Sequence, residues 1–259
     1  MQDHISRWKR TVIKDDCETN SMKENFLYWT SENKEIDELI RHTQLNAFQT
    51  CDYLEWIPFE KFEMVKYIGN GGFCSIYSAL WMEGPRWNWD DGAQEWARAG
   101  PMTVALKRLD NSQKISSSYI NQIKTYHKCL QSALLAETFG ITKDPTSNYM
   151  IVMKYQYLDR HNGILSWKDI IDILQGIARG LERIHIEGKI HRNLHGGNLF
   201  IEDDEILTDA RISDVGLYGP CYYHENKNSG QVYGVLPYIA LVHKFCFLQK
   251  KKISFLELV

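Results

Sequence analysis

Apolar residues recur at helical spacing in the second half of the chain. Between 167 and 187, the apolar residues Ile170, Ile173, Leu174, Ile177, Leu181 and Ile184 recur at this spacing. Steps of three and four residues are typical of an amphipathic helix. Ser166 and Asp169 form the S-x-x-D pattern of a capping box at its start, and Gly188 lies just beyond its end. The pattern therefore predicts a helix over 167–187.

Shorter helical patterns occur earlier in the chain. Apolar residues between 36 and 45 follow Asn33 at helical spacing, which predicts a short amphipathic helix. This helix is expected to end before Pro58, because proline disfavours helix in the residue that precedes it. Another helix is predicted over 116–136. Residues 1–30 are polar and irregular in pattern, so a loose leader is expected there.

Several stretches have the pattern of β-strands. FEMVKYI before a glycine cluster and Ser75–Leu80 after it predict two strands of a hairpin. MTVALKRL at 102–109 predicts a strand, NYMIVMKY at 148–155 predicts a buried strand, and 199–214 predicts a short hairpin.

Residues 82–103 interrupt this regular pattern. They contain glycines, prolines and three tryptophans, which is typical of an inserted loop or a long hairpin. One interpretation is a surface flap packed on itself. The other is a surface for a partner, because tryptophan is enriched at binding hot spots. The sequence leaves both interpretations open.

Composition narrows the class of protein. The chain has 259 residues, of which 44% are hydrophobic and 24% charged, as in an ordinary globular protein of one large domain or two small lobes. A net charge of −3 gives no reason to expect nucleic acid or an anionic membrane as partner. Six scattered cysteines without metal-ligand spacing are typical of reduced thiols, and neither a signal peptide nor a spanning segment is visible. A soluble cytoplasmic protein is expected.

Two features could contact phosphates. The cluster Gly69-Asn70-Gly71-Gly72 lies between two predicted strands. It is either a tight turn or a loop whose backbone amides approach phosphates without an intervening side chain. Lys107 lies among apolar residues of a predicted strand, so its side chain either extends outward to solvent or points into a cleft to meet an anion.

Two oxygen-bearing side chains could bind a metal ion. Asp214 follows a predicted strand and is followed closely by Gly216, and Asn198 lies sixteen residues earlier. Mg²⁺ prefers hard oxygen ligands and commonly needs only one or two from the protein when phosphates supply others. The pair is therefore a candidate magnesium site.

The order of these motifs resembles that of a protein kinase domain. The glycine cluster, V-x-x-K at 104–107, HR-x-L-x-x-x-N at 191–198 and D-x-G at 214–216 occur in kinase order. The segments GITKDP and VYGVLPYIA look like the tyrosine-kinase-like families expanded in fungi. The resemblance implies an α+β fold, a kinase-like pair of lobes with a small β-rich lobe and an incomplete helical large lobe.

The resemblance also implies a division of the chain. Residues 1–59 would be a leader with a short helix, and 60–156 the small lobe with the Trp-rich insertion 82–103. Residues 157–240 would be part of the large lobe, followed by a non-matching tail at 241–259.

The resemblance implies a role for each site residue. The nucleotide would be bound by Ile68, Gly69, Asn70 and Gly71, between Ile76, Ala105 and Phe200, and against Met153 and the hinge residue Tyr155. Lys107 would hold the α- and β-phosphates of ATP, with 154–156 as the hinge. Asn198 and Asp214 would ligate Mg²⁺. ATP and Mg²⁺ are thus the expected cofactors, and a protein substrate or a partner kinase the expected partner.

The sequence departs from the kinase pattern at three places. Asn193 replaces the catalytic Asp, which accepts the proton of the substrate hydroxyl, and an amide is no base. Losing general-base assistance costs about 10²–10⁴-fold in rate. Gln122 replaces the Glu that would pair with Lys107. After Ala240 the family pattern ends, so a truncated large lobe is expected.

Three functions follow from these observations. The first is a nucleotide-binding pseudokinase that acts through contacts. The second is an active Ser, Thr or Tyr protein kinase, because the metal and phosphate ligands are complete. The third is a truncated kinase fragment without function, because the pattern ends abruptly at Leu241.

Overall fold

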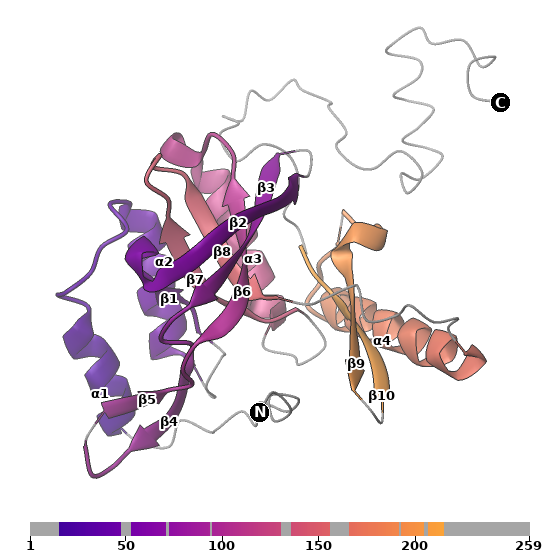
Figure 1. Ribbon diagram of the computed structural model, residues 1–259, viewed down its shortest axis with the longest axis horizontal. Coiled ribbons are helices and arrows are strands. Elements are labelled where there is room, and N and C mark those ends of the chain that lie inside the picture. Colours follow the sequence, from indigo (N-terminus) through magenta and orange to yellow (C-terminus); the bar gives the residue numbers. More distant parts are fainter. Residues whose placement is uncertain are drawn as a thin grey trace, which may run out of the picture.

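The computed structural model describes residues 16–47, 53–70, 73–93, 95–130, 136–155, 166–191, 193–204 and 207–214. They form two parts. One part is a six-stranded sheet with helices packed on it, and the other is a long helix with a two-stranded hairpin (Figure 1). The helices and the mostly antiparallel strands confirm the α+β fold class.

The six strands of the sheet lie between residues 55 and 154. In chain order these are β1 (Glu55–Trp56), β2 (Phe62–Asn70), β3 (Cys74–Trp81), β6 (Met102–Leu109), β7 (Thr138–Lys143) and β8 (Tyr149–Lys154). Their spatial order is β1-β7-β8-β6-β3-β2. Neighbours are antiparallel, except that β1 and β7 are parallel. The strands predicted at 102–109, at 148–155 and beside the glycine cluster are confirmed.

Side chains of β6 alternate between two apolar clusters. Val104 and Leu106 are buried in the cluster on one face of the sheet. Leu109 belongs to the other cluster, against which Ala105 also packs. Successive side chains of a strand point to opposite faces, so Lys107 shares the face of Ala105 and Leu109. The strand thereby directs the candidate lysine to the side that the helices cover.

Four α-helices are described, and two of them begin at a capping side chain. The four helices are α1 (Asp16–Asn25), α2 (Lys34–Leu45), α3 (Ser117–Leu130) and α4 (Trp167–Ile186), with short 3-10 helices at Phe59–Lys61, Ser112–Lys114 and Gly196–Asn198. Asn33 caps α2 by accepting hydrogen bonds from the backbone amides of Glu35 and Ile36. Ser166 and Asp169 form the predicted capping box of α4. The three predicted helices are confirmed, although α3 is described only to residue 130.

Helix α1 corrects the expectation of an irregular leader. Residues 16–25 are helical, and Met22 is only 1% exposed. The turn between α1 and α2 is held by Arg41, whose guanidinium lies over the rings of Phe26 and Trp29 and donates to the Phe26 carbonyl at 3.2 Å. Residues 16–25 have no apolar stripe that would predict a helix, and α1 is in contact with α2, which stabilises it.

Strand β1 approaches β7 closely at a glycine. Gly140 is the register partner of Glu55. A Cβ atom at position 140 would lie 2.2 Å from the carbonyl oxygen of Glu55. Only glycine allows this approach, which ties the segment after α2 to the edge of the sheet.

The insertion 82–103 forms its own hairpin of β4 (Arg86–Asp90) and β5 (Glu95–Arg98). Trp89 and Trp96 face each other across it, edge to face, at 5.6 Å. Arg98 binds the buried Glu55 carboxylate at 2.8 Å, and Arg86 lies 3.9 Å from it. Burial raises the pKa of Glu55, but the two guanidinium groups outweigh burial and lower it overall. The long hairpin is confirmed, and its use as a partner surface stays a hypothesis.

The second part of the molecule packs a hairpin on one helix. Strands β9 (Leu199–Asp204) and β10 (Leu207–Ile212) are antiparallel and lie against α4, as predicted for 199–214 (Figure 1). Ile184 and Ile212 extend the apolar cluster on the helix-covered face of the sheet into this part. None of the helices found among the described residues is long and apolar enough to cross a membrane.

Candidate nucleotide and phosphotransfer site

Lys107 forms a buried ion pair with Asp214. It lies in β6, in register with Ile76 of β3 and Ile151 of β8. Its Nζ contacts Oδ2 of Asp214, and both residues are less than a tenth exposed. An isolated charge is costly to bury, so each residue needs the other. Of the two interpretations of Lys107, the structure shows the inward one, and the pair joins the sheet to the end of the β9–β10 hairpin.

Asp214 has an unusual backbone conformation. Its backbone lies in the left-handed region, with φ 61°. Aspartate adopts this conformation more readily than most residues. The preceding Ser213 is buried, and its N–H donates to the carbonyl of Asn198 at 2.9 Å. The turn thereby directs the carboxylate toward Lys107.

His191 is held between the two ends of the site. It is buried, its Nε2 lies 2.7 Å from the carbonyl oxygen of Ser213, and its Nδ1 accepts from the Asn193 N–H at 3.1 Å. A ring that accepts at Nδ1 and donates at Nε2 is neutral. Burial lowers the pKa of His191 below its ordinary value of 6.5, although the Ser213 carbonyl and the Asp214 carboxylate act the other way. The neutral ring therefore fixes the loop that begins at Asn193.

Asn198 and Asn193 are joined within the same loop. The buried Asn198 donates from Nδ2 to the carbonyl oxygen of Asn193 at 2.8 Å. Its own carbonyl accepts the N–H of Ser213. The loop is thus held by backbone and amide groups, while the Asn193 side chain adds a neutral amide where general-base chemistry needs a carboxylate.

The site has the donors that a magnesium ion prefers. The bond from Nδ2 of Asn198 orients that amide, and its Oδ1 is a hard oxygen ligand, as is the Asp214 carboxylate. Across the part of the chain that the structure describes, no cluster of three or more His, Cys, Asp or Glu residues could hold a metal by itself. The residues fit Mg²⁺ that also receives phosphate oxygens, which needs few protein ligands.

The surface expected to contact adenine lies on the same face as Lys107. Ala105 is in register with Met153 of β8. Met153 is part of the buried cluster, and Ala105 and Phe200 pack against that cluster. Tyr155 follows β8 directly and is half-buried. The structure therefore brings Ala105, Met153 and Phe200 to one apolar cluster, on the side of the sheet to which Lys107 points.

The described part of the glycine cluster, Gly69 and Asn70, ends β2 opposite the start of β3. Gly69 and Asn70 are in register with Ile76 and Ser75. A Cβ atom at Gly69 would meet nothing within 4 Å. Ile68 is 48% exposed. Gly71, which was predicted to contact phosphate, lies outside the described residues.

Asp110 anchors the glycine hairpin and was not predicted from sequence. It accepts from the Ser75 hydroxyl at 3.0 Å and from Nε of Arg108 at 2.9 Å. Its backbone N–H donates to the carbonyl of Phe73 at 3.2 Å. These bonds tie the start of β3 to the end of β6. The signal available in the sequence was a charged pair just after the strand that carries Lys107.

Glu137 was also missed, and it bridges the two parts of the molecule. Its carboxylate lies 3.8 Å from Nζ of Lys154 in β8 and 3.5 Å from Nη1 of Arg211 in β10. The neighbouring Ala136 donates its N–H to the carbonyl of Ile212 at 3.0 Å. Glu137 therefore holds the end of β8, next to the predicted hinge, close to β10, the strand that precedes Asp214. No short motif marks such a residue.

Gln122 lies on α3, as predicted, and is half-buried. Its amide is neutral, so the charge that compensates Lys107 comes from Asp214. Arg192, Gln156 and the change of pattern after Ala240 lie outside the described residues.

Comparisons with known proteins agree with this arrangement. The family model described as protein tyrosine and serine/threonine kinase matches residues 62–239. The match covers more than half of the chain, and the chain belongs to this family.

Individual relatives are distant. The chain is 27% identical over 62% of its length to a G-type lectin S-receptor-like serine/threonine-protein kinase of Arabidopsis thaliana, of which it covers 19%. It is 25% identical over 69% of its length to a leucine-rich repeat receptor protein kinase of Oryza sativa, covering 13% of it. For the serine/threonine-protein kinase PLK4 of Nematostella vectensis, the identity is 23% over 61% of this chain and 15% of the relative.

The chain therefore spans about a fifth or less of the length of these relatives. Kinase domains use ATP and Mg²⁺ and act on protein substrates. The finer assignment to a tyrosine-kinase-like family of fungi stays a prediction.

Proposed function

We propose that this chain is an ATP-binding kinase domain with strongly impaired phosphotransfer, which acts mainly by binding. Lys107, Asn198 and Asp214 support nucleotide binding, because Lys107 and Asp214 form a buried ion pair and the backbone of Asn198 bonds to Ser213, the residue before Asp214. Bound Mg²⁺ would supply positive charge to the phosphate oxygens. The chain's own residues would orient the nucleotide and exclude water from its base.

The observation that carries the impairment is Asn193. Its backbone is fixed from both sides, by His191 and by Asn198. The loop is therefore built to present the side chain at position 193, and that side chain cannot accept a proton as a base. The lack of a general base lowers the rate of phosphotransfer about 10²–10⁴-fold, while positioning of the nucleotide can leave a trace of activity.

The first test is a thermal-shift titration of the full chain with Mg-ATP. A ligand at 100 times its dissociation constant stabilises the native state by about 2.7 kcal/mol. Lys107→Met is the variant that should lose the shift. A protein that melts cooperatively without any shift would contradict nucleotide binding at this site.

The alternative is an active Ser, Thr or Tyr protein kinase. The complete set of Lys107, Asn198 and Asp214 favours it, and two of the three relatives described above are named serine/threonine kinases. A turnover above about 1 s⁻¹ on a generic protein substrate would support this alternative. Asp214→Asn is the control, since activity unchanged by it would belong to a contaminant.

The setting and partners of this domain are part of the same proposal. We place it in the cytoplasm on the basis of its scattered cysteines, with a protein substrate or a partner kinase as the bound protein. Subcellular fractionation of the tagged full-length protein tests the location. Recovery with the membrane or secreted fraction would contradict it.

A further inference from the structure

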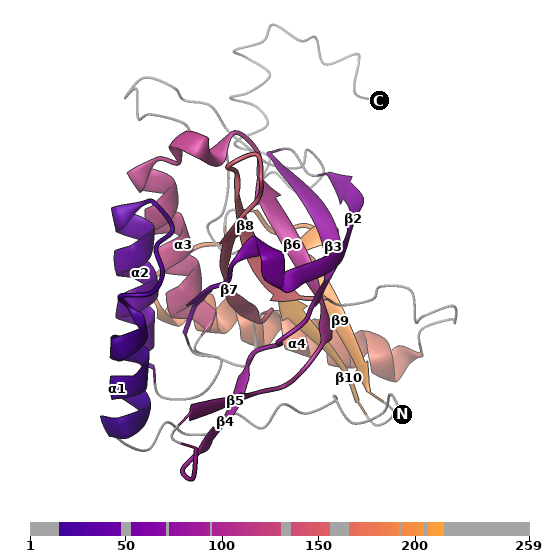
Figure 2. The ribbon, with the colours of Figure 1, turned by 60° about the vertical axis from the view of Figure 1, so that its left-hand side comes forward.

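Helix α2 precedes the residues that match the kinase family and packs on α3. The match begins at residue 62, whereas α2 ends at Leu45. Figure 2 shows α2 and α3 side by side on the same side of the sheet, and the two helices are in contact. A helix outside the family match thus covers the helix that lies over the Lys107 face of the sheet.

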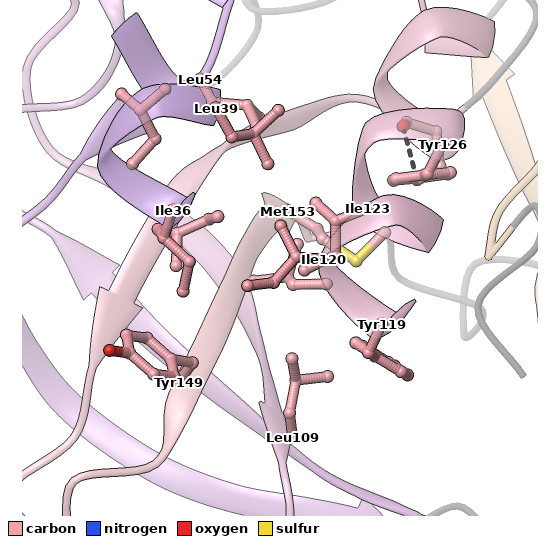
Figure 3. Close-up of a cluster of buried hydrophobic side chains, with 14 of the residues drawn as sticks. Ile36, Leu39, Leu54, Leu109, Tyr119, Ile120, Ile123, Tyr126, Tyr149 and Met153 are labelled. Atoms are coloured by element: carbon pink, nitrogen blue, oxygen red, sulfur yellow. Dashed lines mark hydrogen bonds between the residues drawn. The ribbon is translucent and has the colours of Figure 1, made fainter. Parts of the chain in front are cut away.

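The contact is apolar and buried. Ile36, Leu39 and Ile40 of α2 belong to the same cluster as Tyr119, Ile120, Ile123 and Tyr126 of α3. Figure 3 shows Ile36 and Leu39 of α2 on the side that faces Ile120 and Ile123 of α3, with Leu54 beside Leu39 and Met153 beside Ile120. Burying such side chains stabilises each by about 1.5–3 kcal/mol relative to exposure. Separating the two helices would expose most of them to water.

A buried aspartate fixes the start of α2. Asp37 accepts from the Ser31 N–H and from the Thr30 hydroxyl, each at 2.7 Å, and from the Ser31 hydroxyl. The carbonyl of Ser31 accepts in turn from the Tyr149 hydroxyl of β8 at 2.9 Å. Burial, with the Glu32 and Asp37 carboxylates nearby, raises the pKa of Tyr149 to about 12, so this hydroxyl remains a donor. Asp37 therefore links the start of α2, through Ser31, to strand β8.

Further polar contacts hold both ends of α2. At its start, Glu35 accepts from the hydroxyl of Ser117, the first residue of α3, at 2.7 Å. At its end, Gln44 donates to the Leu54 carbonyl at 2.9 Å, and the Thr43 hydroxyl accepts from the Leu54 N–H at 3.0 Å. The helix is thus fixed to α3 at one end and to the segment before β1 at the other.

The position of α3 matters to Lys107. Ile120 and Ile123 of α3 share a cluster with Ile151 and Met153 of β8, the neighbour of β6. In kinases, a Glu on this helix pairs with the lysine and helps to hold the active arrangement. Gln122 carries no charge at the corresponding position. The apolar contacts of α3 with β8 and with α2 contribute to holding it in place.

We propose that α2 is a built-in clamp on α3, which sets the position of that helix over Lys107 and so strengthens nucleotide binding. The effect on nucleotide rests on the proposed function, whereas the effect on α3 does not. The clamp connects residues outside the family match to the site, so a partner or modification that displaces α2 would weaken the site without touching it.

The test uses the full chain and amide hydrogen exchange read by mass spectrometry, with Mg-ATP affinity measured in parallel. Asp37→Asn weakens the hydrogen bonds that the Asp37 carboxylate accepts from Thr30 and Ser31. Ser117→Ala removes the exposed hydrogen bond to Glu35 between the two helices, and it is used if the first variant does not fold. Phe139→Leu is the matched control, because Phe139 is buried in the cluster on the opposite face of the sheet. Each variant is measured at the same interval below its own melting temperature.

Asp37→Asn should raise exchange in α3 about tenfold, and Ser117→Ala about threefold, as expected for lost hydrogen bonds. The dissociation constant for Mg-ATP should rise in both variants, and more in Asp37→Asn than in Ser117→Ala. Phe139→Leu should change neither exchange in α3 nor affinity. Unchanged exchange in α3 of both α2–α3 variants would overturn the clamp. A wild-type chain that binds no Mg-ATP would refute the proposed function, while the exchange data would still decide the clamp.

Discussion

The two parts of the molecule differ in how they bury their apolar residues. Both faces of the sheet are covered by side chains, with one cluster under the helices and another on the far face. Helix α4 buries Ile184 toward the sheet and β10, but Trp167 is 82% exposed and Leu174 59% exposed. Among the described residues, no element covers this outer surface of α4.

The residues that stabilise the fold and the residues expected to take part in phosphotransfer lie mostly in different parts of the molecule. Most members of the two apolar clusters lie in the sheet part, which also contains the ion pair of the buried Glu55 with Arg98. The loop before β9 contains Asn193, and it is held mainly by polar contacts of His191 and Asn198. Substitutions in the sheet should therefore change the free energy of unfolding, whereas a substitution at Asn193 should change the rate and leave stability alone.

Asn193→Asp should produce the largest effect. Restoring a carboxylate at the base position should raise phosphotransfer by about 10²–10⁴-fold, or roughly 3–5 kcal/mol of barrier. The measurement is incorporation of labelled phosphate into a generic substrate. Asn193→Ala is the matched control and should not gain activity. An Asp variant as slow as wild type would place the defect elsewhere in the site.

Glu55→Gln should give the next largest effect, on stability. Glu55 is buried and carries the carboxylate that binds Arg98. Removing one partner of a buried ion pair costs about 3–5 kcal/mol, because the other charge loses its compensation. Urea denaturation of the full chain measures this cost. Glu63→Gln is the control, because Glu63 lies exposed on β2, and a similar loss there would show that charge in general is responsible.

Gly140→Ala should destabilise less, by about 1–3 kcal/mol, since an overpacked site forces backbone shifts. The new Cβ atom would lie 2.2 Å from the Glu55 carbonyl oxygen and push β1 from β7. Gly69→Ala is the matched control, because its Cβ atom would meet nothing within 4 Å. Equal midpoints of urea denaturation for the two variants would contradict the close approach of β1.

A fall in pH should weaken the fold through His191. The pKa of this buried ring is below 6.5 in the folded chain. Below pH 6.5 the unfolded chain therefore takes up a proton that the folded chain does not, and stability is lost as pH falls from there toward the folded pKa. Urea midpoints between about pH 7.5 and 5.5 measure the slope. His191→Gln should flatten it, and an identical slope in that variant would exclude His191 as the cause.

Leu174→Gln should have the smallest effect. The residue is mostly exposed on α4, and glutamine has nearly the helix propensity of leucine, so a change within about 0.5 kcal/mol is expected. Ile184→Ala, on the buried side of the same helix, should cost about 2–5 kcal/mol. A loss of that size at position 174 would show that residues outside the described ones cover the outer surface.

Local patterns predicted much of the fold. The capping box of Ser166 and Asp169, the apolar period of α4 and the alternation along β6 each depend on neighbours in sequence. Helix α1 was missed because a polar helix of ten residues has little local signal and is stabilised by α2. The parallel pairing of β1 with β7 was missed for a similar reason, since it depends on an approach to Gly140 from a distant segment.

For the site, motif order indicated the residues but not the contacts that hold them. Asp110 and Glu137 are missing from the predicted set because they act between segments that are far apart in sequence. Coulombic and hydrogen-bonding contacts depend on distance in space, and a one-dimensional pattern does not contain that distance.

The sequence by itself determined the type of those elements that have a strong local pattern, the kinase-like order of motifs and the loss of a base at Asn193, because each depends on residue chemistry and short spacing. Only the tertiary structure decided that Lys107 meets Asp214, that Glu137 bridges the two parts and that α2 packs on α3. The physical reason is that burial and charge pairing are properties of the folded chain, in which residues far apart in sequence exclude water from one another.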